Sequence, residues 1–179
     1  HDPRRFGLLR LVSTGRLMED PSLAALGFDP VTDPPTGTAL HVLAGGTRIS
    51  VKAFLLDQRR IAGIGNIYAS EILHRAGLDP RARAGRVPAA RWDTVARATR
   101  AVLAEAIGRC GTTFATYRTL WNEPGGYGDR LRVYDRSGEP CRACGTAIRR
   151  IVQGARSTFY CPRCQPARPA RRPRQAPTA

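Results

Sequence analysis

Four of the five cysteines form two pairs, and their spacing constrains the fold more than any other feature of the sequence. The pairs are Cys141 with Cys144 and Cys161 with Cys164, each of the form Cys-x2-Cys, with 16 residues between them. Two short turns that each offer two sulfurs, joined by a segment long enough for a hairpin, can surround one ion tetrahedrally. The spacing therefore predicts one structural Zn²⁺ held by four thiolates, in preference to the disulfides of an oxidising compartment.

The charge of the chain is strongly positive and unevenly distributed. Lys+Arg number 29 against 14 Asp+Glu, which gives a net charge of +15, and every basic residue except Lys52 is an arginine. The guanidinium fork suits phosphates and base edges, although a GC-rich genome would produce the same preference. From Cys141 onward there are nine arginines and no acidic residue. These features predict a polyanionic partner whose contacts concentrate around the cysteine pairs.

Helical periodicity dominates the middle of the chain. From residue 88 to 107 apolar side chains recur at i, i+3, i+4 and i+7, which is typical of an amphipathic helix. Cys110 follows this helix, and we expect it to be a half-buried structural thiol. Asp20 before Pro21, and Ser50, are typical residues for the start of a helix. Four more helices are predicted, over residues 20–27, 39–43, 50–58 and 66–75.

The two ends of the chain differ from this helical middle. Residues 1–17 are interpreted as the end of a β-rich unit, with a strand over 6–12 whose edges need partners. A second strand is predicted over 131–134, and the basic segment after residue 165 has too little apolar content to fold. No apolar run approaches the roughly 18 residues of a membrane span. The first residues lack the apolar stretch of a signal peptide. The sequence begins with His1 and not with Met, which suggests a fragment or a processed product.

Two glycines precede the predicted helix over 66–75. In Gly63-Ile64-Gly65-Asn66 the glycines permit a tight turn, and the helix start offers free N–H groups to a phosphate. A plain turn between two helices is the alternative and, from this motif alone, the commoner explanation. Glu71 could orient neighbouring groups from this helix or lie on its surface, and we interpret His41 and His74 as structural residues.

Three segments in order resemble the formamidopyrimidine-DNA glycosylase and endonuclease VIII family. Residues 55–71, LLDQRRIAGIGNIYASE, are similar to its helix–two-turn–helix motif, and residues 1–7, HDPRRFG, to a loop near the end of its N-terminal domain. Residues 134–145, YDRSGEPCRACG, with 156–161, RSTFYC, resemble its zinc finger. The sequence NIYASE at residues 66–71 and the zinc finger favour the formamidopyrimidine branch of the family. The similarity extends over about residues 1–165.

The resemblance assigns DNA contacts to particular residues. Arg4 and Phe6 match side chains that fill the void left when a base is flipped out, and Arg48 and Lys52, one helical turn apart, match backbone contacts. For each pair the alternative is an ordinary strand or a solvated helix face. Arg156 matches an arginine at the tip of the zinc hairpin, which assists elimination, and we expect it to stabilise the leaving phosphate electrostatically. The remaining expected DNA contacts are Gly65 and Asn66, at the helix start described above, and Tyr134, whose hydroxyl could donate to a phosphate. The alternative for Tyr134 is a strand aromatic packed on the zinc module.

The resemblance also implies a fold, which is mainly α with a small β zinc finger. Residues 1–17 would be remnant strands at the end of an N-terminal β-sandwich domain. A helix–two-turn–helix DNA-binding domain is expected over 18–120, a zinc-finger hairpin over 131–165, and a disordered basic tail over 166–179. The implied protein is a bacterial, cytoplasmic and nucleoid-associated monomer with one structural Zn²⁺ and no membrane partner.

The activity implied is base-excision repair of duplex DNA that contains an oxidised purine or an abasic site. In the family an N-terminal proline amine attacks the sugar, and β,δ-elimination then nicks the strand. That proline, the glutamate after it and an assisting lysine have no counterpart in this sequence, so we expect the chain by itself to bind such DNA with little or no turnover. The alternative is a non-catalytic nucleic-acid-binding protein that combines a helix–two-turn–helix with a zinc ribbon.

Overall fold

The computed structural model describes residues 10–112 and 125–167, which are mainly helical with one small sheet. Its α-helices are α1 (Pro21–Ala24), α2 (Gly37–Ala44), α3 (Val51–Leu56), α4 (Asn66–Arg75) and α5 (Ala89–Ile107). Short 3-10 helices cover Thr14–Glu19, Ala84–Arg86 and Gly128–Arg130. The sheet consists of β1 (Arg149–Gln153) and β2 (Arg156–Tyr160).

Polar side chains begin the helices where the sequence predicts. Asp20 accepts a hydrogen bond from the backbone N–H of Ser22 at the start of α1, and Ser50 accepts one from Ala53 at the start of α3. These bonds satisfy backbone donors that have no partner within the helix. The predicted bounds of α4 agree with the structure, and Gly77 follows it with a φ of 61°.

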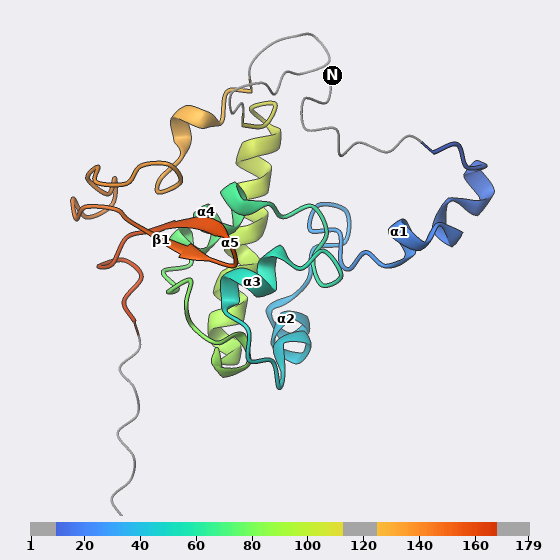
Figure 1. Ribbon diagram of the computed structural model, residues 1–179, viewed down its shortest axis with the longest axis horizontal. Helices are drawn as coiled ribbons and strands as arrows, with labels where there is room; N and C mark the ends of the chain where they lie inside the picture. Colours follow the sequence, from blue (N-terminus) through green and yellow to red (C-terminus); the bar gives the residue numbers. More distant parts are fainter. Residues whose placement is uncertain (1–9, 113–124, 168–179) are drawn as a thin grey trace, which may run out of the picture.

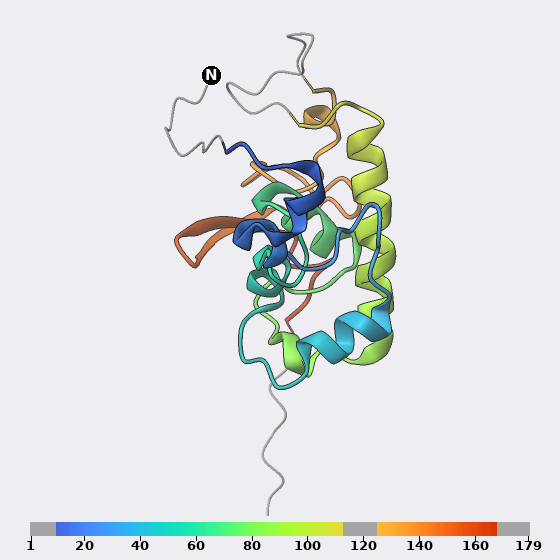
Figure 2. The same ribbon diagram turned by 90° about the vertical axis from the view of Figure 1, so that its right-hand side faces the viewer.

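The long helix α5 organises the core. It packs against α2 and α4, and Trp92 from α5 meets Phe54 from α3 with ring centroids 4.9 Å apart, both side chains fully buried. The apolar stripe recognised in the sequence is the face that forms these contacts. Figure 1 shows α5 running through the middle of the molecule, and Figure 2, turned by 90°, shows it along one side while the β1–β2 hairpin projects from the other. Within the described ranges, no helix is long and apolar enough to cross a membrane.

The hairpin is an antiparallel pair with a two-residue turn. Gln153 pairs with Arg156, so Gly154 and Ala155 form the turn, with φ of 55° and 57°. Positive φ at both turn residues gives the twist that suits a right-handed pair of strands. The turn therefore fixes the register of the hairpin and makes Arg156 the first residue after its tip.

The strand predicted over residues 131–134 is wrong. The carboxylate of Glu71, on α4, accepts hydrogen bonds from the backbone N–H groups of Arg132, Val133 and Tyr134 at 2.9–3.0 Å. These three consecutive donors are therefore unavailable to a neighbouring strand. Glu71 is only 1% exposed, so it is not a surface residue but the anchor of the segment that leads into the cysteine module.

Two other expectations also differ from the structure. Residues 10–12 form no strand and precede a 3-10 helix, while residues 6–9 of that expected strand lie outside the described ranges. Cys110 is exposed, not half-buried. It follows the end of α5 with a φ of 56°, in a turn closed by the hydrogen bond from Gly111 N–H to the Ala106 carbonyl. Because the chain has left the helix there, the apolar stripe of α5 no longer sets its orientation.

We expect Glu71→Gln to lower the free energy of unfolding of the zinc-loaded chain by about 2–3 kcal/mol, measured by urea denaturation. An amide keeps the shape but brings an N–H₂ group against backbone N–H donors, and it lacks the charge that strengthens these bonds. Glu105→Gln, which breaks a partly exposed ion pair with Arg75, is the control and should cost less than about 1 kcal/mol. Equal effects of the two substitutions would contradict the anchoring role.

Candidate metal centre and nucleic-acid interface

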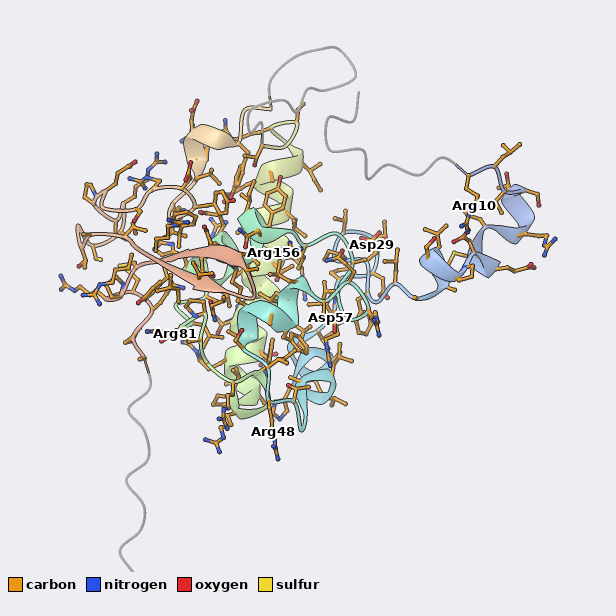
Figure 3. The ribbon with its side chains drawn as sticks, viewed as in Figure 1. Arg10, Asp29, Arg48, Asp57, Arg81 and Arg156 are labelled. Atoms are coloured by element: carbon orange, nitrogen blue, oxygen red, sulfur yellow. The ribbon has the colours of Figure 1, made fainter. Side chains whose placement is uncertain are left out.

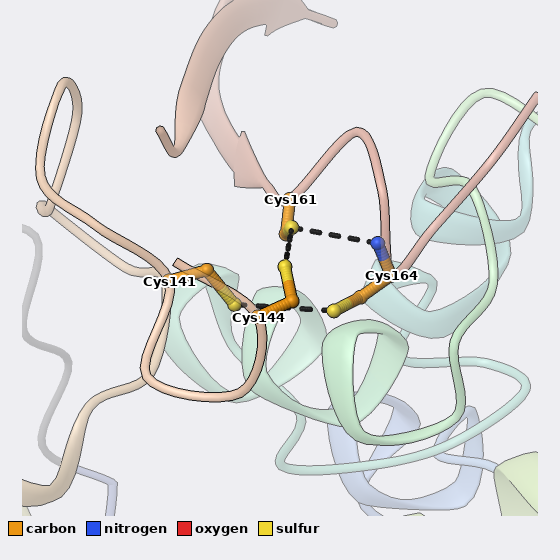
Figure 4. Close-up of side chains that lie close together, drawn as sticks. All are labelled: Cys141, Cys144, Cys161 and Cys164. Carbon is orange, nitrogen blue, oxygen red and sulfur yellow. Dashed lines mark hydrogen bonds between the residues drawn. The ribbon is translucent and has the colours of Figure 1, made fainter. Parts of the chain in front are cut away.

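The four paired cysteines converge on one point. Their sulfurs all lie within 4.8 Å of one another, with 3.9 Å between Cys141 and Cys164 and 3.4 Å between Cys144 and Cys161 (Figure 4). Zn–S bonds of about 2.3 Å in a tetrahedron separate the sulfurs by about 3.8 Å. The donor set and its spacing therefore fit one structural Zn²⁺, as the sequence predicts.

The surroundings act differently on the individual sulfurs. The backbone N–H of Ala143 points at the sulfur of Cys141, and that of Cys164 at the sulfur of Cys161. Hydrogen bonds from Thr146 lower the pKa of the Cys144 thiol to about 6, whereas burial raises the pKa of the Cys161 and Cys164 thiols. Thiolates are the form that binds metal, so the buried cysteines need the charge of an ion to stay deprotonated.

Two buried side chains attach the metal centre to the helical core, and no pattern in the sequence indicates either role. Gln165 is 1% exposed; its carbonyl accepts from the Cys161 N–H, and its amide donates to the Leu78 carbonyl. His74, at the end of α4, lies with its Nε2 atom 3.5 Å from the Cys141 sulfur. The sequence analysis interprets His74 as a structural residue, but it does not predict that the imidazole lies beside the metal ligand Cys141.

A second set of contacts attaches the hairpin to α3 and α4. The Nζ atom of Lys52 donates to the Ser157 carbonyl at 2.9 Å and to the Thr158 hydroxyl at 2.6 Å. The side-chain amide of Asn66 donates to the same Ser157 carbonyl at 3.0 Å. Residues about 90 to 105 positions apart are thereby held on one face of the molecule.

The start of α4 opens onto this face. Gly65 is the N-cap of α4, and a side chain added there would meet open space, while Gly63 before it has a φ of 74°. The first N–H groups of the helix are therefore not covered by a side chain at the cap position. Such N–H groups, with the positive end of the helix dipole behind them, are suited to a phosphate.

Tyr134 and Arg156 complete the group. The Tyr134 hydroxyl lies 3.5 Å from the Asn66 amide, and its ring packs edge-on against Phe159 at 5.0 Å. Arg156 is exposed beside the hairpin turn (Figure 3). We call Lys52, Asn66, Tyr134 and Arg156 the hairpin interface. In the described ranges neither Lys52 nor Arg156 forms an ion pair with a carboxylate, so their positive charge is not neutralised by an acidic side chain.

Other expected DNA contacts lie elsewhere. Arg48 precedes α3 in a loop and is not one helical turn from Lys52, because Ser50 begins the helix after it. Figure 3 shows Arg48 at one end of the molecule, away from Arg156. The alternative of a solvated helix face is wrong for Lys52, which is 1% exposed. Arg4 and Phe6 lie outside the described residues.

Burial changes the proton affinity of Lys52. Removal of its amine from water lowers its pKa to about 8, and the charge of Arg156 contributes in the same direction. The amine therefore begins to lose its proton just above neutral pH. A phosphate near Arg156 and Lys52 would favour the protonated form.

Removal of the metal should unfold the cysteine module and weaken any ligand binding that depends on the hairpin. We expect about one Zn²⁺ per chain by metal analysis, because four thiolates form one tetrahedral site. Chelation should abolish the dispersed amide signals of residues 138–165 in NMR spectra while the signals of α5 persist, since the module has only a small core of its own. An unchanged hairpin spectrum after complete metal loss would contradict a structural ion.

The lowered pKa of Lys52 predicts a pH-dependent stability. In the unfolded chain Lys52 keeps its ordinary pKa near 10.5, so between pH 8 and 10.5 the unfolded state binds more protons and stability rises with pH. From pH 7.5 to 9.5, the free energy of unfolding of the zinc-loaded chain should increase by about 1–2 kcal/mol more than that of a Lys52→Met variant. Parallel pH profiles of the two proteins, measured by urea denaturation, would exclude a perturbed Lys52.

Comparison with known families identifies both parts of this site. Residues 26–118, more than half of the chain, match the family model described as the H2TH domain of formamidopyrimidine-DNA glycosylase. Residues 138–167 match the model described as a zinc finger found in FPG and IleRS. The first match includes α2 to α5 with Lys52 and Asn66, and the second includes all four clustered cysteines and Arg156.

Whole-sequence comparison gives the same result. The chain is 48% identical over 168 residues to a formamidopyrimidine-DNA glycosylase of Bordetella pertussis and 46% identical over 165 residues to one of Methylococcus capsulatus. Each alignment covers 92% of this chain, and 61% and 60% of the respective relative. The chain thus spans about three-fifths of the length of the curated relatives it matches.

Solved structures agree in fold. The MutM (Fpg) protein from Thermus thermophilus superposes with a TM-score of 0.86 at 42% identity, covering 94% of this chain and 64% of that one. Fpg from Lactococcus lactis, in complex with DNA containing an abasic site, gives a TM-score of 0.79 at 27% identity, with 87% and 57% covered. With its helix–two-turn–helix, its four-cysteine finger and these relatives, the chain belongs to the formamidopyrimidine-DNA glycosylase family.

Proposed function

We propose that this chain is the damaged-DNA-binding and zinc-finger portion of a base-excision-repair glycosylase and abasic-site lyase that removes oxidised purines such as 8-oxoguanine and formamidopyrimidines. The hairpin interface is the observation that carries the proposal. The exposed Arg156, a tyrosine hydroxyl and an open helix start lie on one face, with the buried Lys52 ammonium behind it, and together they suit the phosphates of a distorted duplex.

The relatives support the choice of DNA. Structures of the Lactococcus lactis protein contain DNA with an abasic site or with Fapy-dG. We propose that this chain binds the same kind of duplex, as a monomer, on the nucleoid of a bacterial cell. The DNA-binding unit would extend over residues 18–120 and the zinc finger over 131–165, with Zn²⁺ keeping the two cysteine turns together.

Each residue of the hairpin interface has a distinct part in the proposed binding. Arg156 would contact the phosphate beside the lesion and stabilise charge on it as the strand is cut, since a guanidinium is too weak an acid to give up its proton. Asn66, Gly65 and Tyr134 would hold the neighbouring phosphate. Lys52 would position β2 through Ser157 and Thr158 and add its charge from behind. Arg48, Arg4 and Phe6 remain proposed contacts on the strength of the family resemblance.

The same proposal includes a statement about this chain by itself, namely that it forms no covalent intermediate with DNA. A lyase of this kind needs a free amine to form a Schiff base with the sugar. Lys52 is the only lysine in the sequence, and its amine is buried and bound to β2. We therefore propose that the 179-residue chain binds abasic DNA without forming a covalent adduct.

Binding to an abasic duplex tests the proposal. We expect Arg156→Ala to weaken binding about ten-fold at low ionic strength, since a phosphate contact of this kind contributes about 1–2 kcal/mol, and to reduce the salt dependence by about one charge. Arg97→Ala, on the exposed face of α5, is the control and should change binding less than about two-fold. Fluorescence anisotropy at several salt concentrations measures both quantities.

Borohydride trapping on the same duplex tests whether this chain carries a reactive amine. No trapped adduct, with binding intact, supports the non-covalent role of this chain. A trapped adduct of the original chain would overturn it: loss of the adduct in Lys52→Met would assign the reaction to the buried amine, and its persistence would assign it to the α-amino group of His1. Binding that is equal for the Arg156 variant and its control would instead reject the hairpin interface as the DNA contact.

A further inference from the structure

A second concentration of arginines lies outside the hairpin interface. An open cleft of about 440 Å³ is formed by the C-terminal end of α5, the segment around the 3-10 helix Gly128–Arg130, and the first cysteine turn. Four of its six lining residues are arginines. The lining consists of Glu105, Arg109, Arg130, Arg132, Arg142 and Ala143.

The cleft and the hairpin interface lie at opposite ends of α4. Asn66, the first residue of α4, contacts the hairpin, whereas Arg75, its last residue, forms an ion pair with Glu105 in the cleft. Ten helical residues span about 15 Å. Figure 2 shows the hairpin projecting from one side of the molecule and α5, which supplies Glu105, along the other. A small anion bound in the cleft is therefore not in contact with the hairpin interface.

The one acidic group of the cleft already has a partner. Arg75 donates to the Glu105 carboxylate at 2.5 Å. This bond lowers the pKa of Glu105, and the charges of Arg132 and Arg109 contribute to the same shift. Glu105 is thus ionised and is compensated by a residue outside the lining, so the four lining arginines carry an excess of positive charge.

The donors of these arginines are largely unused. Among the described residues, the guanidinium groups of Arg109, Arg130 and Arg132 form no hydrogen bond or ion pair. Arg142 donates one bond, to the Asp129 carbonyl at 2.8 Å. Each guanidinium offers five N–H donors in a planar fork that matches the oxygens of a phosphate or a carboxylate. Several such forks around one cleft are suited to an anion with more than one charge.

The residues that line the cleft favour a phosphate over the carboxylates of an acidic peptide. Apart from Ala143 the lining offers no apolar side chain, so an acidic peptide would find charge but no surface on which to bury apolar residues. Phosphate groups need no such surface, because they bind through charge and hydrogen bonds. We propose that this cleft is a second phosphate-binding site, independent of the hairpin interface, for an oligophosphate or for the backbone of a second stretch of nucleic acid.

Calorimetry with inorganic pyrophosphate tests the site directly. The titration uses the zinc-loaded 179-residue chain after saturation with one equivalent of abasic duplex, and the zinc content is checked afterwards. We expect one saturable site. Arg109→Gln combined with Arg130→Gln should weaken pyrophosphate binding about ten-fold or more, because both exposed forks face the cleft.

The matched control removes the same charge elsewhere on α5. Arg97→Gln combined with Arg100→Gln alters two exposed arginines outside the cleft and should change pyrophosphate affinity less than about two-fold. No saturable binding, or equal losses in the two double variants, would overturn the proposal. Displacement of pyrophosphate by the first equivalent of abasic duplex would also overturn it, since the two sites would then be one.

A further arm identifies the source of the phosphate. An undamaged short duplex is added to the complex with abasic DNA. A second binding step that pyrophosphate competes with, and that the Arg109/Arg130 variant lacks, assigns the site to a nucleic-acid backbone. Pyrophosphate binding without this step assigns it to a free oligophosphate. The Arg109/Arg130 variant should bind the first abasic duplex normally, so failure of the cleft and failure of the proposed DNA-binding function give different results.

Discussion

The buried carboxylate of Glu71 is the interaction on which the arrangement of the molecule depends. It accepts three consecutive backbone N–H groups, from Arg132 to Tyr134, and so holds the entry to the cysteine module against the middle of α4. A carboxylate in a buried position must find such donors, because its desolvation is otherwise costly. The result is that Tyr134 lies beside Asn66, while Arg132 lies at the other end of α4 with Glu105.

Three independent attachments keep the cysteine module in place. Glu71 holds the segment that leads into the module, and Lys52 and Asn66 hold β2. Gln165 connects the last cysteine turn to the backbone carbonyl of Leu78. Most of these contacts involve backbone groups, so they fix position without depending on many side chains of the module. A Zn²⁺ site that closes the two turns then completes a rigid support for the exposed Arg156, and rigid elements are the best supports for a binding group.

The helix starts at Asp20 and Ser50, the bounds of α4 and the four-cysteine centre could be predicted, because each is set by residues near in sequence, whereas α2 begins at Gly37 and not at the predicted residue 39. A cap needs one side chain and the next few N–H groups, and each half of the metal site needs two cysteines three positions apart. The predictions that failed did so for two different reasons, one a distant partner and the other a nearby helix cap. Residues 131–134 have the composition of a strand, but their donors belong to Glu71. Arg48 follows the helical spacing to Lys52, but the cap at Ser50 comes between them.

The sequence alone determined that this chain is helical with a zinc-binding module, strongly basic, and related to a family of DNA glycosylases. Only the tertiary structure decided which basic residues act together. Charge and residue type are properties of each position, whereas proximity depends on the packing of α3, α4 and the hairpin. That packing buried the single lysine, placed it behind Arg156 and separated both from Arg48. It also gathered four arginines in a cleft near the end of α4 that is opposite to its contact with the hairpin.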